Sequence, residues 1–368
     1  MSEARQQNRV ATLQRVSASG KVILAGEYAV LEGAPCLVMA TDRRLVMDFI
    51  PAEPGQLVID TAGLSEVRTT LAWQAGEWRE LNVSPHGRFD LVVRLFNFLS
   101  KVDAFQASLL RGWHFIIDSR ALFDADYKLG LGSSAALTVS LISGLWRLLG
   151  GTTAGYEQQW QQCFLAHNYA QQKSGSGADI AGALCGGVLC FTNERFKNEC
   201  FTNGCSLAQN RSVRLQSWSV PDELHMAFYW SGKSAHTPTL LKRLDRWRAH
   251  HEHDYRKLQA QMNEVMQHLR EQRNAHAVIT TMKHFTQLLH HLDAHASVGI
   301  FEGCHAPLWQ ASRAKEELVY KTCGAGGGDL GLALSTCAET LADFSRLAQA
   351  HGATQVDLSV DLRGVHVH

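Results

Sequence analysis

The chain has 368 residues, of which 45% are hydrophobic and 19% are charged. This length predicts two domains, and the composition is that of a soluble globular enzyme. Lys plus Arg and Asp plus Glu number 35 each, and such a balance gives no electrostatic signature of binding to nucleic acid or to an acidic membrane. An anionic substrate would therefore have to be met by a few placed cations.

The N-terminal residues 1–10 are polar, and no apolar run is long enough to span a membrane, so we expect neither a signal peptide nor a membrane-spanning segment. Nine cysteines, an odd number, indicate the reduced thiols of a cytoplasmic protein rather than a disulfide framework. Four of them are spaced more widely than the paired cysteines of structural zinc sites, which makes zinc the weaker interpretation: Cys185, Cys190, Cys200 and Cys205.

Taken in chain order, the first part of the sequence predicts short apolar strands and two helices. Gly and Pro turns bound the strands, and apolar residues with a period near 3.6 indicate the helices. The predicted strands span 22–24, 36–40, 45–50, 114–117 and 186–191, and the predicted helices span 91–99 and 135–149.

The pattern changes near Pro221, where long polar helices replace the short strands. This order predicts an α+β sandwich with helices on one face of an antiparallel sheet. We therefore predict two domains, 1–220 and 221–368. The predicted elements of the second are a strand at 225–230, helices over 237–295, a strand at 331–334, a helix at 338–351 and a strand at 354–360.

The most informative segment is YKLGLGSSAA at residues 127–136, which is followed directly by an apolar helix. Its glycines allow a ligand to approach the backbone, and a helix N-terminus offers free N–H groups to a phosphate. The two serine hydroxyls could cap the helix or reach a phosphate oxygen or Mg²⁺. It is neither a P-loop nor a dinucleotide fingerprint, and an ordinary Ser-capped helix start remains the alternative.

Two further glycine-rich segments lie at the two ends of the chain. Residues 321–331 read KTCGAGGGDLG, and so many glycines favour a loop that lies against a ligand or another loop over a flexible hairpin turn. Residues 19–33 read SGKVILAGEYAVLEG, in which Lys21 begins an apolar strand. A buried lysine needs a partner, although a lysine at a strand edge is most often simply solvated.

These three segments, in this order, resemble the GHMP kinase superfamily, and the resemblance covers nearly the whole chain. It implies an α+β fold with two-domain GHMP kinase architecture. The N-terminal domain would be ribosomal S5 domain 2-like, and the C-terminal domain would be a ferredoxin-like α/β sandwich. It also implies binding of ATP and Mg²⁺, a small-molecule acceptor, and no nucleic-acid or membrane partner.

Finer features resemble the phosphomevalonate kinases. They are GEYAVLE at 26–32, Lys128 directly before the middle loop, AQQKSGSGAD at 170–179, WSGKSAHT at 230–237 and GAGGGD at 324–329. The sequence departs from that family's pattern at Ser19, Ala178 and Ser231, where Pro, Phe and Thr are usual. The change to Ala178 enlarges the space beside Asp179.

The resemblance implies roles for individual residues. The catalytic residues would be Lys21, Lys128 and Asp179. The nucleotide would be bound by Gly130, Leu131, Gly132, Ser133, Ser134 and Ala135, with Mg²⁺ at Ser133 or Ser134. The substrate would be bound by Lys21, Tyr28, Ser174, Ser176, Trp230, Thr237, Gly326 and Gly327. Taken alone, Asp179 would be a helix N-cap before residues 180–184.

The expected reaction is transfer of the γ-phosphoryl group of ATP to mevalonate 5-phosphate, giving mevalonate 5-diphosphate in the route to isoprenoids. A phosphate nucleophile is mostly deprotonated at neutral pH, so it needs nearby cations more than a general base. We therefore expect Asp179 to orient Lys21 and the acceptor. The alternatives are mevalonate kinase, where Asp179 would serve as base, and a non-catalytic nucleotide-binding relative.

Overall fold

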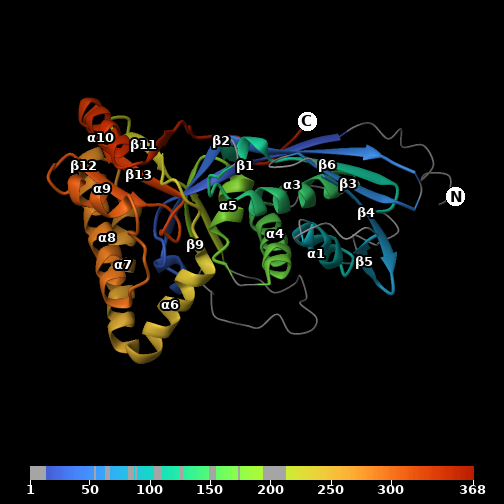
Figure 1. Cartoon of the computed structure of the whole chain (residues 1–368), viewed down its shortest axis with the longest axis horizontal. Helices are drawn as coiled ribbons and strands as arrows, with labels where there is room; N and C mark the ends of the chain where they lie inside the picture. The colour runs from blue at the N-terminus through green and yellow to red at the C-terminus, as the bar shows by residue number, and fades with distance from the viewer. Residues whose placement is uncertain are drawn as a thin grey trace.

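A large mixed sheet runs through the N-terminal part of the protein (Figure 1). The computed structural model describes residues 14–53, 55–62, 67–81, 87, 89–102, 110–124, 127–148, 155–172, 175–193 and 213–368. The strand order is β10-β9-β2-β6-β3-β4-β5, with β1 paired to both β2 and β15. The strands are β1 Gln14–Ala25, β2 Cys36–Pro51, β3 Leu57–Ala62, β4 Val67–Gln74, β5 Glu77–Glu80, β6 Trp113–Asp118, β9 Val188–Asn193, β10 Val213–Ser217 and β15 His366–Val367.

The pairing of β1 with β2 shifts register between Ser19 and Gly20, directly before Lys21. A Cβ at Gly20 would lie 2.7 Å from the hydroxyl of Thr41, so only glycine allows this close approach. The irregularity places Lys21 at the point where the strand meets the glycine-rich loop. The two strands predicted at 36–40 and 45–50 are one continuous strand, β2.

Helices cover one face of this sheet (Figure 1). The helices α3 and α5 pack on β1 and β2, while α4 lies against α1, α3 and α5. At Gly144 in α3, a Cβ would lie 2.2 Å from the Phe49 ring of β2, which shows how closely helix and sheet approach. These helices are α1 Asp90–Leu99, α3 Ser133–Leu148, α4 Tyr156–Gln171 and α5 Ala178–Cys185.

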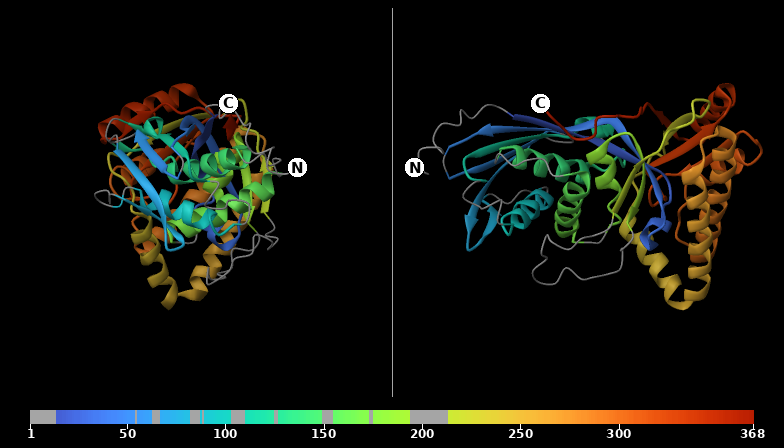
Figure 2. Two further views of the ribbon diagram at one scale, coloured as in Figure 1. Left: turned by 90° about the vertical axis from the view of Figure 1, so that its right-hand side faces the viewer. Right: turned by 180° about the vertical axis from the view of Figure 1, so that it is seen from behind.

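A second, antiparallel sheet has the order β12-β13-β11-β14 and is covered by the helices of the C-terminal part (Figure 2). The helices α8 and α9 pack on β12, and α10 packs on the other three strands. The fold is thus α+β, as predicted. The elements are β11 His225–Trp230, α6 Thr237–His250, α7 Glu252–Glu271, α8 Ala275–Ala296, α9 His305–Ser312, β12 Leu318–Thr322, β13 Leu330–Ser335, α10 Ala338–Ala350 and β14 Thr354–Val356.

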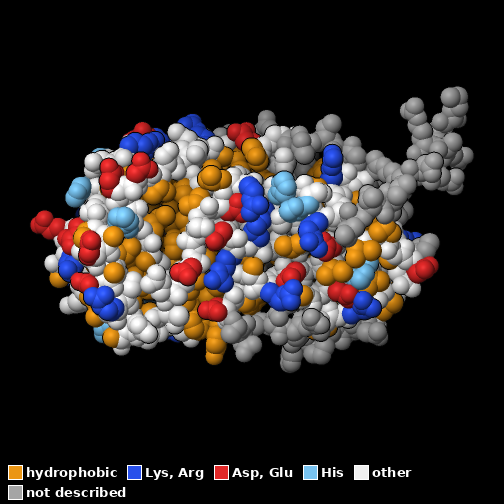
Figure 3. Space-filling model, turned by 90° about the horizontal axis from the view of Figure 1, so that it is seen from above, with side chains coloured by type: hydrophobic (Ala, Val, Ile, Leu, Met, Phe, Trp, Pro, Cys, Tyr) orange, Lys and Arg blue, Asp and Glu red, His pale blue; other side chains and the backbone are white. Residues whose placement is uncertain are grey.

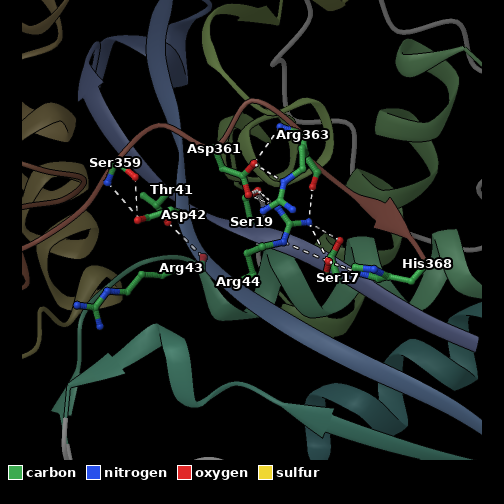
Figure 4. Close-up of polar contacts among 11 residues, drawn as sticks. Ser17, Ser19, Thr41, Asp42, Arg43, Arg44, Ser359, Asp361, Arg363 and His368 are labelled. Carbon is green, nitrogen blue, oxygen red and sulfur yellow. Dashed lines mark hydrogen bonds and ion pairs between the residues drawn. The ribbon is translucent and has the colours of Figure 1, made fainter.

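The end of the chain returns to the first sheet (Figure 4). Arg44 of β2 forms an ion pair with Asp361, and its guanidinium also donates to the backbone oxygen of Gly364 at 2.6 Å. The predicted strand at 354–360 is therefore shorter, and Val360 instead bridges to the first sheet. The chain passes from the first sheet to the second between Ser217, where β10 ends, and His225, where β11 begins. The division into domains at residue 220 stays a prediction.

Charged side chains of both signs are interspersed on the face seen in Figure 3, in keeping with the neutral net charge. Within the described ranges, no helix is long and apolar enough to cross a membrane. Cys200 and Cys205 lie outside the described residues, so the four-cysteine pattern stays untested.

Candidate active site

The side chain of Lys21 lies between two glycines. A Cβ on Gly132 would come within 2.8 Å of the Lys21 Cε, and one on Gly182 would come within 3.0 Å of the Lys21 Cβ. The backbone N–H of Lys21 donates to the oxygen of Leu131 at 2.8 Å, and its Nζ donates to the oxygen of Gly130 at 3.5 Å. Strand β1 is therefore joined directly to the glycine-rich loop, with the ammonium group beside it.

The glycine-rich loop leads into α3, which begins at Ser133. Gly130 and Gly132 have φ values of +76° and +75°, in the left-handed region that other residues rarely adopt. Leu131 and Ala135 are buried, so their side chains belong to the core, and the Ala135 N–H donates to the oxygen of Gly132 at 3.0 Å. Free N–H groups at the start of α3 suit a phosphate.

Two adjoining cavities meet at Lys21. The first, of about 270 Å³, is bordered by the loop glycines, Lys128 and Asp329. The second, of about 350 Å³, is bordered by Asp179 and Ser176, among others. The residues that line both are Lys21, Ile23, Thr237, Pro238, Gly324 and Ala325.

Asp179 lies in the first turn of α5, and one of its carboxylate oxygens accepts from the N–H of Ile180 at 3.0 Å. Ser176 lies just before this helix, and its hydroxyl accepts from the N–H of Ala178 at 3.3 Å. Both border the second cavity together with Tyr28. The structure therefore brings Lys21, Asp179, Ser176 and Tyr28 together around one space.

Three polar residues of α4 that sequence reasoning missed also border the second cavity: His167, Asn168 and Gln171. The His167 Nε2 lies 3.1 Å from the Ser134 hydroxyl, and the Gln171 amide lies 3.0 Å from the same nitrogen. His167 and Asn168 are both buried. The available signal was a pair of adjacent polar residues inside an otherwise apolar helix face, because such residues need partners when buried.

Asp329 packs against the glycine-rich loop, since a Cβ on Gly130 would lie 2.6 Å from its carboxyl carbon. Burial raises the pKa of this carboxyl group, while the nearby Lys21 and Lys128 oppose the increase. The carboxylate accepts from the N–H of Ala235 at 3.2 Å. The third glycine-rich segment thus supplies an acidic wall to the first cavity.

The early and late glycine-rich segments are also joined directly. Lys321 and Glu27 form an ion pair at 2.5 Å, with 0% and 3% of their side chains exposed. Glu27 also accepts from the N–H of Gly324 at 3.3 Å, and the Tyr28 hydroxyl donates to the oxygen of Ala325 at 2.6 Å. Burial raises the pKa of Glu27, and the charge of Lys321 opposes this. These contacts fix the wall shared by the two cavities.

His305 of α9 contacts the backbone of the late glycine-rich segment, residues 321–331. Its Nε2 lies 3.2 Å from the oxygen of Gly328, and its Nδ1 lies 2.8 Å from the Tyr320 hydroxyl. Because a carbonyl oxygen only accepts, Nε2 carries the proton and Nδ1 accepts from Tyr320. Burial lowers the pKa of His305 to about 4, so the ring is neutral at pH 7.

Some predicted substrate-binding residues do not border either cavity. The Trp230 ring lies 4.8 Å from the ring of Tyr127. Tyr127 and Lys128 form the short strand β8 (Tyr127–Lys128), which pairs with β7 (Phe123–Asp124). Trp230 therefore supports the segment that carries Lys128.

Gly326 and Gly327 pack against the loop at 299–300. A Cβ on Gly326 would lie 2.6 Å from the oxygen of Ile300, and Gly327 donates to the same oxygen at 2.8 Å. Ser174 lies outside the described residues. The substrate-binding roles of these residues stay predictions.

The described residues contain no cluster of three or more His, Cys, Asp or Glu side chains that could hold a metal ion. Mg²⁺ usually keeps several waters and takes one or two protein oxygens together with substrate phosphates. Ser134 and Asp179 both border the second cavity, and Ser133 begins α3 beside it. This oxygen-donor set fits Mg²⁺ that arrives with a nucleotide.

Comparisons with known proteins match part of the chain to a family model and nearly all of it to a relative. Residues 90–187 match the family model described as GHMP kinases N terminal domain. The chain is 24% identical over 370 residues to the phosphomevalonate kinase of Streptomyces sp. strain CL190, covering 95% of this chain and 97% of that protein.

Two solved structures extend the likeness to the whole fold. A Lin0012 protein from Listeria innocua has a TM-score of 0.81 at 20% identity, with 97% of this chain and 99% of that one covered. Streptococcus pneumoniae phosphomevalonate kinase, in complex with phosphomevalonate and AMPPNP, has a TM-score of 0.75 at 18% identity, with 94% and 99% covered. The chain therefore contains a GHMP kinase N-terminal domain at residues 90–187 and has the GHMP kinase fold.

Proposed function

We propose that this chain transfers the γ-phosphoryl group of ATP to mevalonate 5-phosphate. The observation that carries the proposal is the position of Lys21, which lines both cavities. A cation between two bound anions lowers their repulsion and stabilises the charge on the transferred group. The likeness to a phosphomevalonate kinase along nearly the whole chain supports this acceptor.

The first cavity is proposed to hold the ATP phosphates. The Gly130 and Gly132 backbone, which borders this cavity, and the N-terminus of α3, which follows it in the chain, would bind the phosphate oxygens. Lys128 would add a second cation. Ser133, and Ser134 at the border of the second cavity, would hold Mg²⁺, which when bound would supply further positive charge to the phosphates. The S. pneumoniae relative was solved with AMPPNP, an ATP analogue, which supports a nucleotide site in this fold.

The second cavity is proposed to hold the acceptor. An oxygen of its 5-phosphate attacks the γ-phosphorus, the bond from this phosphorus to the β–γ bridging oxygen breaks, and ADP leaves with the electron pair. The attacking oxygen is already largely deprotonated at pH 7, so Asp179 needs only to orient Lys21 and the acceptor. Ser176, Tyr28 and Thr237 would bind the rest of the substrate.

One observation favours a second candidate, mevalonate kinase. Among the described residues that line the second cavity, Lys21 is the only Lys or Arg. Lys128 borders the first cavity instead. An uncharged hydroxyl acceptor would need fewer cations than a phosphate, and Asp179 would then act as general base.

The test is an ADP-release assay with mevalonate 5-phosphate and mevalonate offered separately at equal concentrations. We expect rapid release with mevalonate 5-phosphate and little with mevalonate. A preference for mevalonate would favour the second candidate. Release with neither acceptor, despite measurable ATP binding, would favour a non-catalytic nucleotide-binding relative.

A further inference from the structure

A third cavity, of about 500 Å³, lies on the other side of the short 3-10 helix η1 (Ala29–Glu32). It is bordered by η1, by α7 and by the adjacent strands β9 and β10, all of which lie near the junction of the two sheets (Figure 2). Its volume is within the range of small-molecule sites. Among the described residues that border it, none was given a role in phosphoryl transfer.

Gln259 of α7 is the lining residue that points to a ligand. Its side chain is 7% exposed, and neither its amide nitrogen nor its amide oxygen has a hydrogen-bond partner within the described part of the chain. A buried amide with both groups unpaired is unfavourable, because each group has lost its hydrogen bonds to water without a replacement. A bound polar molecule would satisfy an amide that the protein itself leaves unpaired.

The charges around the cavity indicate the sign of the ligand. Among the described residues that border it, Arg214 and Arg270 are basic and Glu32 is acidic. The Glu32 carboxylate already accepts from Arg248 at 3.1 Å and from the Tyr255 hydroxyl at 2.8 Å. Arg270 forms an ion pair with Glu271, but the Glu271 side chain is exposed, so this ion pair is weak. The described lining thus carries more basic than acidic side chains.

We propose that this cavity binds a small polar anion through a phosphate or carboxylate group. Arg214 and Arg270 meet the charged group, and the Gln259 amide binds a neighbouring polar atom. Thr192 and Asn263 offer further hydrogen-bonding groups at the rim.

The helix η1 connects this site to the second cavity. Ala29 and Glu32 border the anion site, whereas Val30 and Leu31 border the second cavity. A ligand that fixes η1 therefore alters the wall against which the acceptor binds. This coupling rests on the proposed function, whereas binding of the anion does not.

The binding test uses isothermal titration calorimetry with inorganic phosphate and with citrate, which separate a phosphate source from a carboxylate source. All variants carry Lys21→Met, so that binding in the active-site cavities is weakened. We expect Arg270→Gln to weaken binding of the preferred anion at least tenfold. The matched control is Arg256→Gln on the same helix, whose side chain is 77% exposed and which should bind normally. Equal binding by Arg270→Gln, or no binding of either anion, would overturn the inference.

A second measurement concerns Gln259 itself. Gln259→Met keeps the side-chain length and removes the unpaired amide, so the ligand-free variant should melt at a higher temperature than the wild type and bind the anion at least tenfold more weakly. A lower melting temperature would mean that the amide has a partner in the free protein and would contradict the proposal. Neither measurement depends on turnover, so an inactive enzyme would sink the proposed function and leave this inference standing.

Discussion

Glu27 and Lys321, 294 positions apart in the chain, form a buried ion pair that joins the early and late glycine-rich segments. Removing one partner of such a pair leaves an uncompensated buried charge. We therefore expect Lys321→Met to lower the free energy of unfolding by about 3–5 kcal/mol, as measured by denaturant titration.

The double variant Glu27→Gln, Lys321→Met removes both charges and should be less destabilised than Lys321→Met alone. The exposed pair of Arg346 and Asp343 supplies the control, and Arg346→Gln should cost at most about 1 kcal/mol. If Lys321→Met costs no more than Arg346→Gln, the pair does not join the segments.

His305 predicts a pH dependence of stability. Its folded pKa is about 4, against about 6.5 in an unfolded chain, so the unfolded state binds more protons between these values. This stability is fully present above pH 6.5 and is lost as the pH falls towards 4, by about 3 kcal/mol. Denaturant titrations at pH 7.5, 5.5 and 4.5 should show a steeper loss for the wild type than for His305→Gln. Parallel curves would show that His305 does not titrate in this window.

We expect position 132 of the glycine-rich loop to require glycine. Gly132→Ala adds a Cβ 2.8 Å from the Lys21 Cε at a positive φ, so it should displace the ammonium group and reduce kcat/KM at least tenfold. Gly76→Ala is the matched control, because Gly76 also has a positive φ but no atom lies within 4 Å of the added Cβ. Equal kcat/KM for Gly132→Ala and Gly76→Ala would show that catalysis does not depend on the contact between Gly132 and the Lys21 side chain.

How much of the site could be predicted depends on whether its residues are contiguous in the sequence. The composition of the loop at residues 130–134 indicates a phosphate site, and Lys21 and Asp179 lie in short segments that resemble those of a known family. The structure brings these segments together. The pair of Glu27 and Lys321 could not be predicted, because a buried charge reveals its partner only when two distant segments meet.

The same limit applies to the elements. The strand at 225–230 was predicted with the bounds that the structure has, since its apolar run is clearly bounded. Strands β3 to β5 were missed, because their alternation is weak and they are stabilised by pairing within a sheet whose order the sequence does not reveal. Helix α4 was missed because its apolar residues face several neighbours rather than one.

The roles of charge can be separated by three variants assayed between pH 6 and 9 at saturating ATP. Lys21→Ala and Lys128→Ala should each reduce turnover roughly a hundredfold, since each removes a cation from the site proposed to bind ATP and the acceptor phosphate. Asp179→Asn removes the carboxylate charge and should reduce turnover less, because the acceptor phosphate needs no base. Complete loss with Asp179→Asn at every pH, together with a nearly silent Lys128→Ala, would indicate an alcohol acceptor.

The central claim is that the new bond is a phosphoanhydride, and ³¹P nuclear magnetic resonance observes this bond directly. Purified protein is incubated with ATP, Mg²⁺ and mevalonate 5-phosphate, and in a parallel sample with mevalonate. The account predicts that the phosphomonoester signal of mevalonate 5-phosphate is replaced by two coupled diphosphate signals as ADP forms, with no new signal in the mevalonate sample. A new phosphomonoester signal in the mevalonate sample, with mevalonate 5-phosphate unchanged in the other, would contradict it.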